Sequence, residues 1–144
     1  WGAILGSKAE VRRQGPPLDF DTITAPRMLE LITNNIVDNA RKFARDGVPR
    51  LTIVTAIREP DSPRQRRRWQ LRFEDAGWGF DPSQSRKLFR RFYRTETGSA
   101  HAVAGTGLGL YLARSASKHL GIKLTGHSEG RGKGASFTLE GEVP

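Results

Sequence analysis

The sequence predicts an α+β two-layer sandwich, in which a largely antiparallel sheet carries helices on one face. Four or five strand-like segments follow one another mostly in consecutive or hairpin order, and about three helical segments interrupt them. At 144 residues, the chain has the length of one domain that can bury its own core.

A helix end, a short strand and a long helix are expected first. Residues 1–14 are typical of the end of a helix, which the Gly-Pro-Pro after it stops. Residues 18–21 are a strand candidate. A long helix is predicted from Pro26 to about Ala44, with Thr24 as its N-cap.

Two neighbouring strands and a loop are predicted next. Residues 51–57 are rich in β-branched side chains, and Trp69, Leu71 and Phe73 alternate with polar residues, as in a half-buried strand. The segment between them, residues 59–68, holds two prolines and an arginine run, so it is expected to be a hairpin loop. We expect its arginines to be dispensable for ligand binding elsewhere in the domain, with docking to an acidic surface as their possible use.

A long polar connection, residues 81–104, precedes the last elements. It is basic and rich in small residues, with one helical burst at Leu88-Phe89. A connection of that length inside a small domain is uncommon unless it is functional. Residues 107–120 are then expected to form a helix, and residues 122–125 and 135–139 two strands joined by a glycine-rich turn.

Composition excludes several classes of function. The chain has no cysteine, which rules out disulfides, thiolate zinc sites and cysteine nucleophiles and weakly indicates a reducing cytoplasm. No stretch approaches the roughly 18 apolar residues of a membrane span. The net charge of +9 would favour binding to nucleic acid, but no helix-turn-helix, zinc-finger or RNA-binding aromatic motif accompanies the arginines. Nucleic-acid binding is therefore not expected.

Two asparagines lie on one face of the long predicted helix. Asn35 and Asn39 are four residues apart and stack at the edge of its apolar arc. Asparagine competes for backbone hydrogen bonds in a helix, and a buried carboxamide without partners costs stability. The two side chains are either satisfied within the core or turned toward a cavity, where their oxygens could hold a hard cation such as Mg²⁺.

An acidic residue followed by glycines ends the strand that contains Trp69. In the segment from Asp75 to Phe80, Gly77 and Gly79 let the backbone pass close to a ligand. The Asp75 carboxylate can accept a hydrogen bond from an exocyclic amine, and adenine has one. Taken alone, an ordinary turn is the favoured explanation of this segment.

Glycines also lead into the helix predicted over residues 107–120. In Gly105-Thr106-Gly107-Leu108-Gly109-Leu110, the free N–H groups of a helix N-terminus could bind phosphates. The spacing matches neither the dinucleotide-binding fingerprint nor the P-loop. This motif is weak by itself.

The order of these motifs is more specific than any one of them. An Asn-x-x-x-Asn helix, Asp-x-Gly-x-Gly-Phe, a long connection and Gly-x-Gly-x-Gly before a helix resemble the Bergerat-fold (GHKL) ATPase superfamily. That superfamily includes histidine kinases, type II topoisomerases, heat-shock 90 chaperones and MutL proteins. Residues 87–94 resemble the F box of histidine kinases, and the resemblance extends over about residues 18–141. It implies the ATP-binding catalytic domain of a sensor histidine kinase, with a flexible ATP lid.

The resemblance also implies roles for individual residues. Asn35 would bind Mg²⁺ through its side-chain oxygen, while Lys42 and Arg94 would reach the phosphates, and these three are the catalytic candidates. Asp75 would accept a hydrogen bond from the adenine amino group, and Phe43 would pack on the ring. The residues expected to bind the nucleotide are Asn39, Phe43, Asp75, Gly77, Gly79, Phe80, Gly105, Thr106, Gly107, Leu108, Gly109 and Leu110.

Two positions depart from the superfamily pattern in informative ways. Ala135 stands where many members have a threonine that helps bind adenine through water, which puts that contact in doubt. Asn35 stands where the hydrolytic members have a glutamate that activates water. An amide cannot take a proton from water at neutral pH, so phosphoryl transfer to a nucleophile held elsewhere is expected.

The expected nucleophile is a histidine on a separate helical hairpin. None of His101, His119 and His127 lies in a phosphoacceptor motif. The expected partners are therefore a dimerisation and phosphoacceptor domain, for which residues 1–14 would be the linker, and then a response regulator. Residues 15–144 would form the ATP-binding domain, a cytoplasmic monomer by itself, within a homodimeric parent whose membrane anchoring the sequence leaves open.

Two other interpretations stay open on sequence grounds. The chain could be an anti-sigma-factor type serine kinase, although the F box speaks against it. It could also be a degenerate member that serves as a nucleotide-free binding module, although the intact motif set speaks against that.

Overall fold

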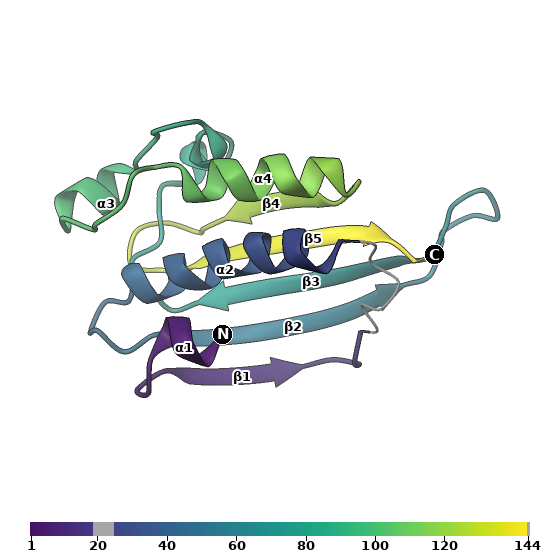
Figure 1. Cartoon of the computed structure of the whole chain (residues 1–144), viewed down its shortest axis with the longest axis horizontal. Coiled ribbons are helices and arrows are strands. Elements are labelled where there is room, and N and C mark those ends of the chain that lie inside the picture. The colour runs from purple at the N-terminus through teal and green to yellow at the C-terminus, as the bar shows by residue number, and fades with distance from the viewer. Residues whose placement is uncertain (19–24, 144) are drawn as a thin grey trace.

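Five strands form one mixed sheet in the order β1-β2-β3-β5-β4 (Figure 1). The structure, a computed structural model, describes residues 1–18 and 25–143. β1 pairs with β2 in parallel, and every other neighbouring pair is antiparallel. The predicted α+β fold, with a largely antiparallel sheet, is confirmed. The strands are β1 (Glu10–Gln14), β2 (Arg50–Arg58), β3 (Arg68–Asp75), β4 (Lys123–His127) and β5 (Ala135–Glu142).

Helices cover one face of this sheet, where the two long ones lie side by side (Figure 1). The longest begins with proline at its first turn, where the missing N–H costs nothing. Its apolar residues recur every four positions and give it one buried face. The helical elements are α1 (Gly2–Leu5), α2 (Pro26–Lys42), α3 (Glu96–Ala100), α4 (Gly109–His119) and two 3₁₀ turns, η1 (Pro82–Gln84) and η2 (Lys87–Phe89).

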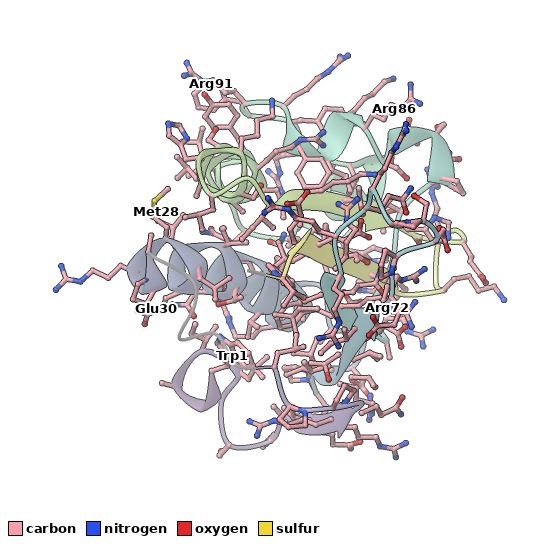
Figure 2. The ribbon with its side chains drawn as sticks, turned by 90° about the vertical axis from the view of Figure 1, so that its right-hand side faces the viewer. Trp1, Met28, Glu30, Arg72, Arg86 and Arg91 are labelled. Carbon is pink, nitrogen blue, oxygen red and sulfur yellow. The ribbon has the colours of Figure 1, made fainter. Side chains whose placement is uncertain are left out.

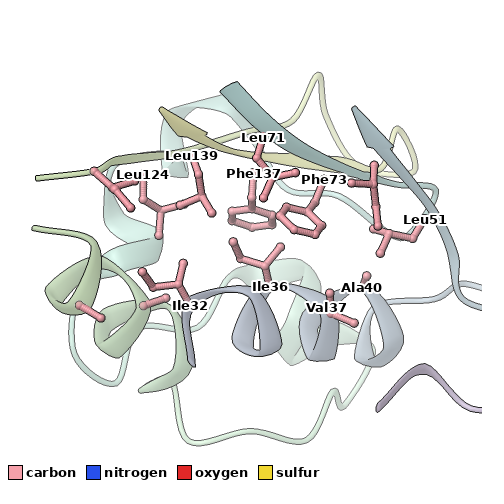
Figure 3. Close-up of a cluster of buried hydrophobic side chains, with 14 of the residues drawn as sticks. Ile32, Ile36, Val37, Ala40, Leu51, Leu71, Phe73, Leu124, Phe137 and Leu139 are labelled. Atoms are coloured by element: carbon pink, nitrogen blue, oxygen red, sulfur yellow. The ribbon is translucent and has the colours of Figure 1, made fainter. Parts of the chain in front are cut away.

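The core lies between the sheet and α2 (Figure 3). Phe73 of β3 stands directly opposite Phe137 of β5, and Leu71 stands opposite Leu139. Ile36 of α2 points at these side chains, and all five residues are at most 5% exposed. Directly opposed residues on neighbouring strands share the closest side-chain contacts in a sheet, so this double pair fixes the register of β3 against β5.

The other face of the sheet is open and charged. Arg72 lies on the side of the sheet away from the helices (Figure 2), where its guanidinium is 2.8 Å from the Glu74 carboxylate. Arg68 pairs with Glu140 across the strands at 2.9 Å. The period-2 alternation predicted for β3 therefore separates a core face from a solvent face.

The expectation of a helix end over residues 1–14 is wrong. Only Gly2–Leu5 is helical, and Glu10–Gln14 forms the edge strand β1, which belongs to the same sheet as the rest of the domain. Every residue of β1 is exposed, so its side chains carry no alternating pattern. Its backbone pairing with residues 50–54, far away in the sequence, makes it a strand.

The remaining boundaries follow the predictions within a few residues. α2 ends at Lys42 rather than at about Ala44, and residues 59–67 form the expected hairpin loop. Thr24, the predicted N-cap, and most of the strand expected over residues 18–21 lie outside the described residues. Among the helices that the structure describes, none has the length and hydropathy needed to span a bilayer.

Leu139→Ala should lower the free energy of unfolding by about 2–5 kcal/mol, because it opens a cavity at a fully buried position of β5. Leu112→Ala is the matched control: Leu112 is 46% exposed on α4, so the same truncation should change stability by less than about 0.5 kcal/mol. Urea unfolding followed by circular dichroism measures both. Similar losses in the two variants would show that the core does not lie where the structure has it.

Candidate functional site

A cavity of about 370 Å³ opens between α2 and the connection that leads to α4. A smaller cavity of about 50 Å³ adjoins it and reaches the ends of β3 and β5. The two cavities share five lining residues, so they are parts of one site. Every predicted site residue except Gly77 lines one of them. The shared residues are Asn39, Phe43, Leu88, Thr95 and Leu110.

Asp75 lies at the inner end of this site, as the last residue of β3. The backbone N–H groups of Gly77 and Ala135 donate to its Oδ1 atom at 2.8 and 3.2 Å. The register explains the second contact, because Ala135 is the residue directly opposite Asp75 on β5. No hydrogen bond from a described residue engages Oδ2, which leaves that oxygen for a ligand in the small cavity.

Burial raises the pKa of the Asp75 carboxyl to about 6, although the two amides that donate to it oppose this shift. The carboxyl is therefore poised between its two protonation states just below neutral pH. As a carboxylate it is an acceptor only, which suits an amino group of a ligand.

The turn after Asp75 is tied down by its backbone. Gly79 has a φ of +63°, and a Cβ there would lie 2.6 Å from two carbonyl oxygens, so only glycine fits. The buried Ser128 accepts a hydrogen bond from the Phe80 N–H at 3.1 Å and donates to the Gly134 carbonyl at 2.7 Å. Phe80 itself is 4% exposed and lines the small cavity.

Asn35 and Asn39 both line the large cavity, so the cavity interpretation of the two asparagines is the one that agrees with the structure. The Asn35 Nδ2 donates to the Leu31 carbonyl at 2.8 Å, which fixes the orientation of the amide. A Cβ on Gly109 would lie 2.7 Å from the Asn35 Oδ1. This oxygen therefore points at the start of α4, where only a glycine leaves room beside it.

A divalent cation could fit at Asn35, because its anchored amide presents an oxygen to the cavity. The described residues contain no group of three or more histidines and carboxylates that could hold a metal ion. Further oxygen ligands would have to come from the bound substrate and from water.

The cationic candidates lie at the rim of the cavity and are already engaged. The Lys42 ammonium is 2.6 Å from the Asp38 carboxylate, one helical turn away. Desolvation alone would raise the pKa of Asp38, but hydrogen bonds from Lys42 and Arg41 outweigh it and lower that pKa. The guanidinium of Arg94 donates to the Val103 carbonyl, within the connection that covers the site.

The glycine-rich segment forms the wall opposite α2. Residues 103–110 line the large cavity without a break. The Thr106 side chain accepts a hydrogen bond from the Leu108 N–H at 3.3 Å, just before α4 begins at Gly109. The free N–H groups of the first turn of α4 are thus next to the cavity, as the sequence predicts.

The connection closes over the site through α3. A Cβ on Gly98 would lie 3.3 Å from the Phe43 ring, so α3 packs closely on the end of α2. Outside the cavity, His101 stacks on Trp78 with ring centroids 3.7 Å apart, and Glu96 forms an ion pair with Arg131 at 2.5 Å. Whether this connection is mobile, as the sequence predicts, stays a prediction.

Comparison with known proteins agrees with this geometry. A family model described as histidine kinase-, DNA gyrase B- and HSP90-like ATPase matches residues 24–143. The chain belongs to this ATPase family. Its members bind ATP, and the chain has the ATP-binding catalytic domain of the sensor histidine kinase type.

Individual relatives are multidomain sensor proteins. The chain is 31% identical over 129 residues to the aerobic respiration control sensor protein ArcB of Escherichia coli K12, covering 89% of this chain and 15% of ArcB. It has the fold of the mycobacterial sensor histidine kinase MprB, with a TM-score of 0.65 at 20% identity over 92% of this chain and 80% of that one. Full-length ShkA in complex with AMPPNP gives a TM-score of 0.66 at 25% identity, over 92% of this chain and 25% of ShkA.

Several residues in or beside the candidate site are missed by sequence reasoning. Asp38 lies between the two asparagines, and only its i,i+4 spacing to Lys42 signals a role. Thr95 and Phe137 line the small cavity, and Ser128 supports it from behind by accepting a hydrogen bond from the Phe80 N–H. The glycine-rich turn between β4 and β5 could have indicated Ser128. Its backbone groups at Gly130 and Gly134 need hydrogen-bond partners, and a nearby buried hydroxyl is the simplest one.

Because the pKa of Asp75 is raised, the free energy of unfolding should fall as the pH rises. The folded state binds this proton more tightly than the unfolded state, so the free energy of unfolding should drop as pH rises from about 4 to about 6, by about 3 kcal/mol in all. Asp75→Asn should remove this dependence. Glu74→Gln, one residue earlier on the open face, should retain it. Urea unfolding between pH 4 and pH 7 compares the three proteins; parallel curves for wild type and Asp75→Asn would contradict the burial of this carboxyl.

Proposed function

We propose that this domain binds ATP with Mg²⁺ and passes the γ-phosphoryl group to a histidine on a separate helical hairpin. The observation that supports the proposal most is a single continuous site with a carboxylate acceptor, Asp75, at its inner end and an anchored amide oxygen, that of Asn35, at its outer end. The likeness to sensor kinases favours this function over the anti-sigma-factor alternative.

The inner end suits adenine. The Asp75 Oδ2 would accept a hydrogen bond from the exocyclic amino group, while Phe43 and Leu88 would pack on the ring. Guanine carries a carbonyl oxygen at that position, and two acceptors facing each other repel. The carboxylate would therefore both bind adenine and reject guanine.

The outer end suits the phosphates. The N–H groups at the start of α4 would bind them, and Lys42 and Arg94 would supply positive charge at the rim. Asn35 would hold Mg²⁺, with Asn39 beside it, and the metal would neutralise charge on the phosphates. Asp38 would keep the Lys42 side chain in place until a phosphate competes for it.

The attacking group would come from outside the domain. Asn35 cannot act as a base toward water, so ATP would stay intact until a nucleophile arrives. The partner would be a dimerisation and phosphoacceptor domain of the same kinase, followed by a response regulator. The chain spans about 15% of ArcB, and the remainder of a relative of that size has room for such a domain.

Asp75→Asn should weaken ATP binding severely and erase the preference for ATP over GTP, because an amide can present a donor or an acceptor to the base. Glu74→Gln, whose side chain lies on the open face beside Arg72, should bind ATP like the wild type. Isothermal titration calorimetry with both nucleotides in Mg²⁺ measures the effect. Unchanged affinity and selectivity in Asp75→Asn would refute the adenine assignment.

The isolated domain should bind ATP but neither label itself nor turn ATP over appreciably. Adding a helical hairpin that carries an acceptor histidine should restore transfer of radiolabelled phosphate. Asn35→Ala should abolish that transfer, whereas Asn34→Ala, a neighbouring asparagine outside the cavity, should leave it intact. Strong self-labelling at His101, His119 or His127 would contradict the division of roles between domains.

A further inference from the structure

A second concave site lies on the far side of η2 and α4 from the nucleotide cavity. It encloses about 370 Å³, and we call it the basic groove. Its walls are formed by η2 with the residues flanking it, and by one face of α4. The side chains that matter are Arg86, Arg90, Arg114 and Lys118, together with the rings of Phe89 and Tyr111.

The positive charge of the basic groove is not neutralised within the described part of the chain. None of its four cationic side chains forms an ion pair with a described residue. The other arginine run differs in this respect, because Arg66, Arg67 and Arg68 pair with Glu142, Glu59 and Glu140. The hairpin loop, the docking candidate on sequence grounds, thus satisfies much of its charge internally, and the groove does not.

The aromatic rings hold two guanidinium groups in place at the groove. Arg114 lies over the Phe89 ring at 4.6 Å, and Arg91 lies over the Tyr111 ring at 4.7 Å while it donates to the Tyr111 hydroxyl at 2.8 Å. The hydrogen bond from Arg91 lowers the pKa of Tyr111, and the charge of Lys118 adds to the effect. A cation over a ring keeps its full charge, and the edge of a stacked guanidinium stays available for bidentate hydrogen bonds.

We propose that the basic groove is a docking site for an acidic segment of a partner protein, one with several Asp or Glu side chains. Arginine forks match carboxylates bidentately, and a cluster of unpaired cations attracts a complementary acidic surface. Nucleic acid suits the groove less well, because single strands bind by stacking bases on free rings and both rings here are covered by arginines. Arg86 and Arg91 extend outward from this side of the molecule, within reach of a partner (Figure 2).

The basic groove and the nucleotide cavity share two elements, η2 and α4, so a partner bound in the groove would contact elements that also line the cavity. In η2, Leu88 lines both parts of the nucleotide cavity, and its neighbour Phe89 lines the groove. In α4, Leu110 and Leu112 face the cavity and Tyr111 faces the groove. A partner in the groove would therefore contact the elements that border the nucleotide, although docking itself requires no nucleotide.

The test uses a fluorescein-labelled oligoglutamate peptide and the whole chain, with binding followed by fluorescence anisotropy at low salt. The groove variant combines Arg86→Ser, Arg90→Ser and Lys118→Ser, all at exposed positions. The control combines Arg64→Ser, Arg66→Ser and Arg67→Ser, which removes the same charge from the hairpin loop. Circular dichroism verifies that both variants fold.

The groove variant should bind the peptide about tenfold more weakly than the wild type, and the loop variant should stay within about twofold. Equal losses in both variants would show that net charge alone attracts the peptide and would overturn the proposal, as would undetectable binding to the wild type. Binding of a labelled oligothymidylate with the same number of negative charges is measured for comparison. Tighter binding of that oligonucleotide, lost in the groove variant, would mark a nucleic-acid site instead of the proposed one.

Discussion

The pairing of β3 with β5 supports both the core and the site. Phe73 against Phe137 and Leu71 against Leu139 fix the register, and the same register brings Ala135 opposite Asp75. A shift by one residue would turn the apolar side chains toward solvent and remove one of the two amides that hold the carboxylate. Recognition of the ligand therefore depends on hydrophobic packing several residues away from it.

The candidate site combines a rigid wall and a wall made of irregular backbone. The rigid wall is α2, whose asparagines face the cavity because a helix brings positions four apart onto one side. The other wall, residues 103–110, has no regular structure until α4 begins, so its free N–H groups are available to a ligand. The chemistry of the site follows from this division: side-chain oxygens stand on one side and backbone donors on the other.

Sequence reasoning works here where local pattern and tertiary structure agree. α2 and β3 have strong periodicity, so they are predictable from the residues alone. Asp75 and the glycines are predictable only from the order of their motifs, because each motif is weak by itself. β1 is not, because its five exposed residues become a strand only by pairing with β2. The difference between the two arginine runs is not predictable either, because two of the glutamates that neutralise the hairpin loop, Glu140 and Glu142, lie on β5, far away in the sequence.

Two of the contacts that hold α3 in place lie outside the cavity. The four residues of the His101–Trp78 stack and the Glu96–Arg131 ion pair line neither part of the cavity. On the proposed function they would affect how long a bound nucleotide stays, whereas Asp75 would select the base and Asn35 would hold the metal ion. Two related kinases with the same pocket residues could therefore differ in nucleotide residence time through these four side chains alone, and an inhibitor that reached beyond the pocket to them could tell such kinases apart.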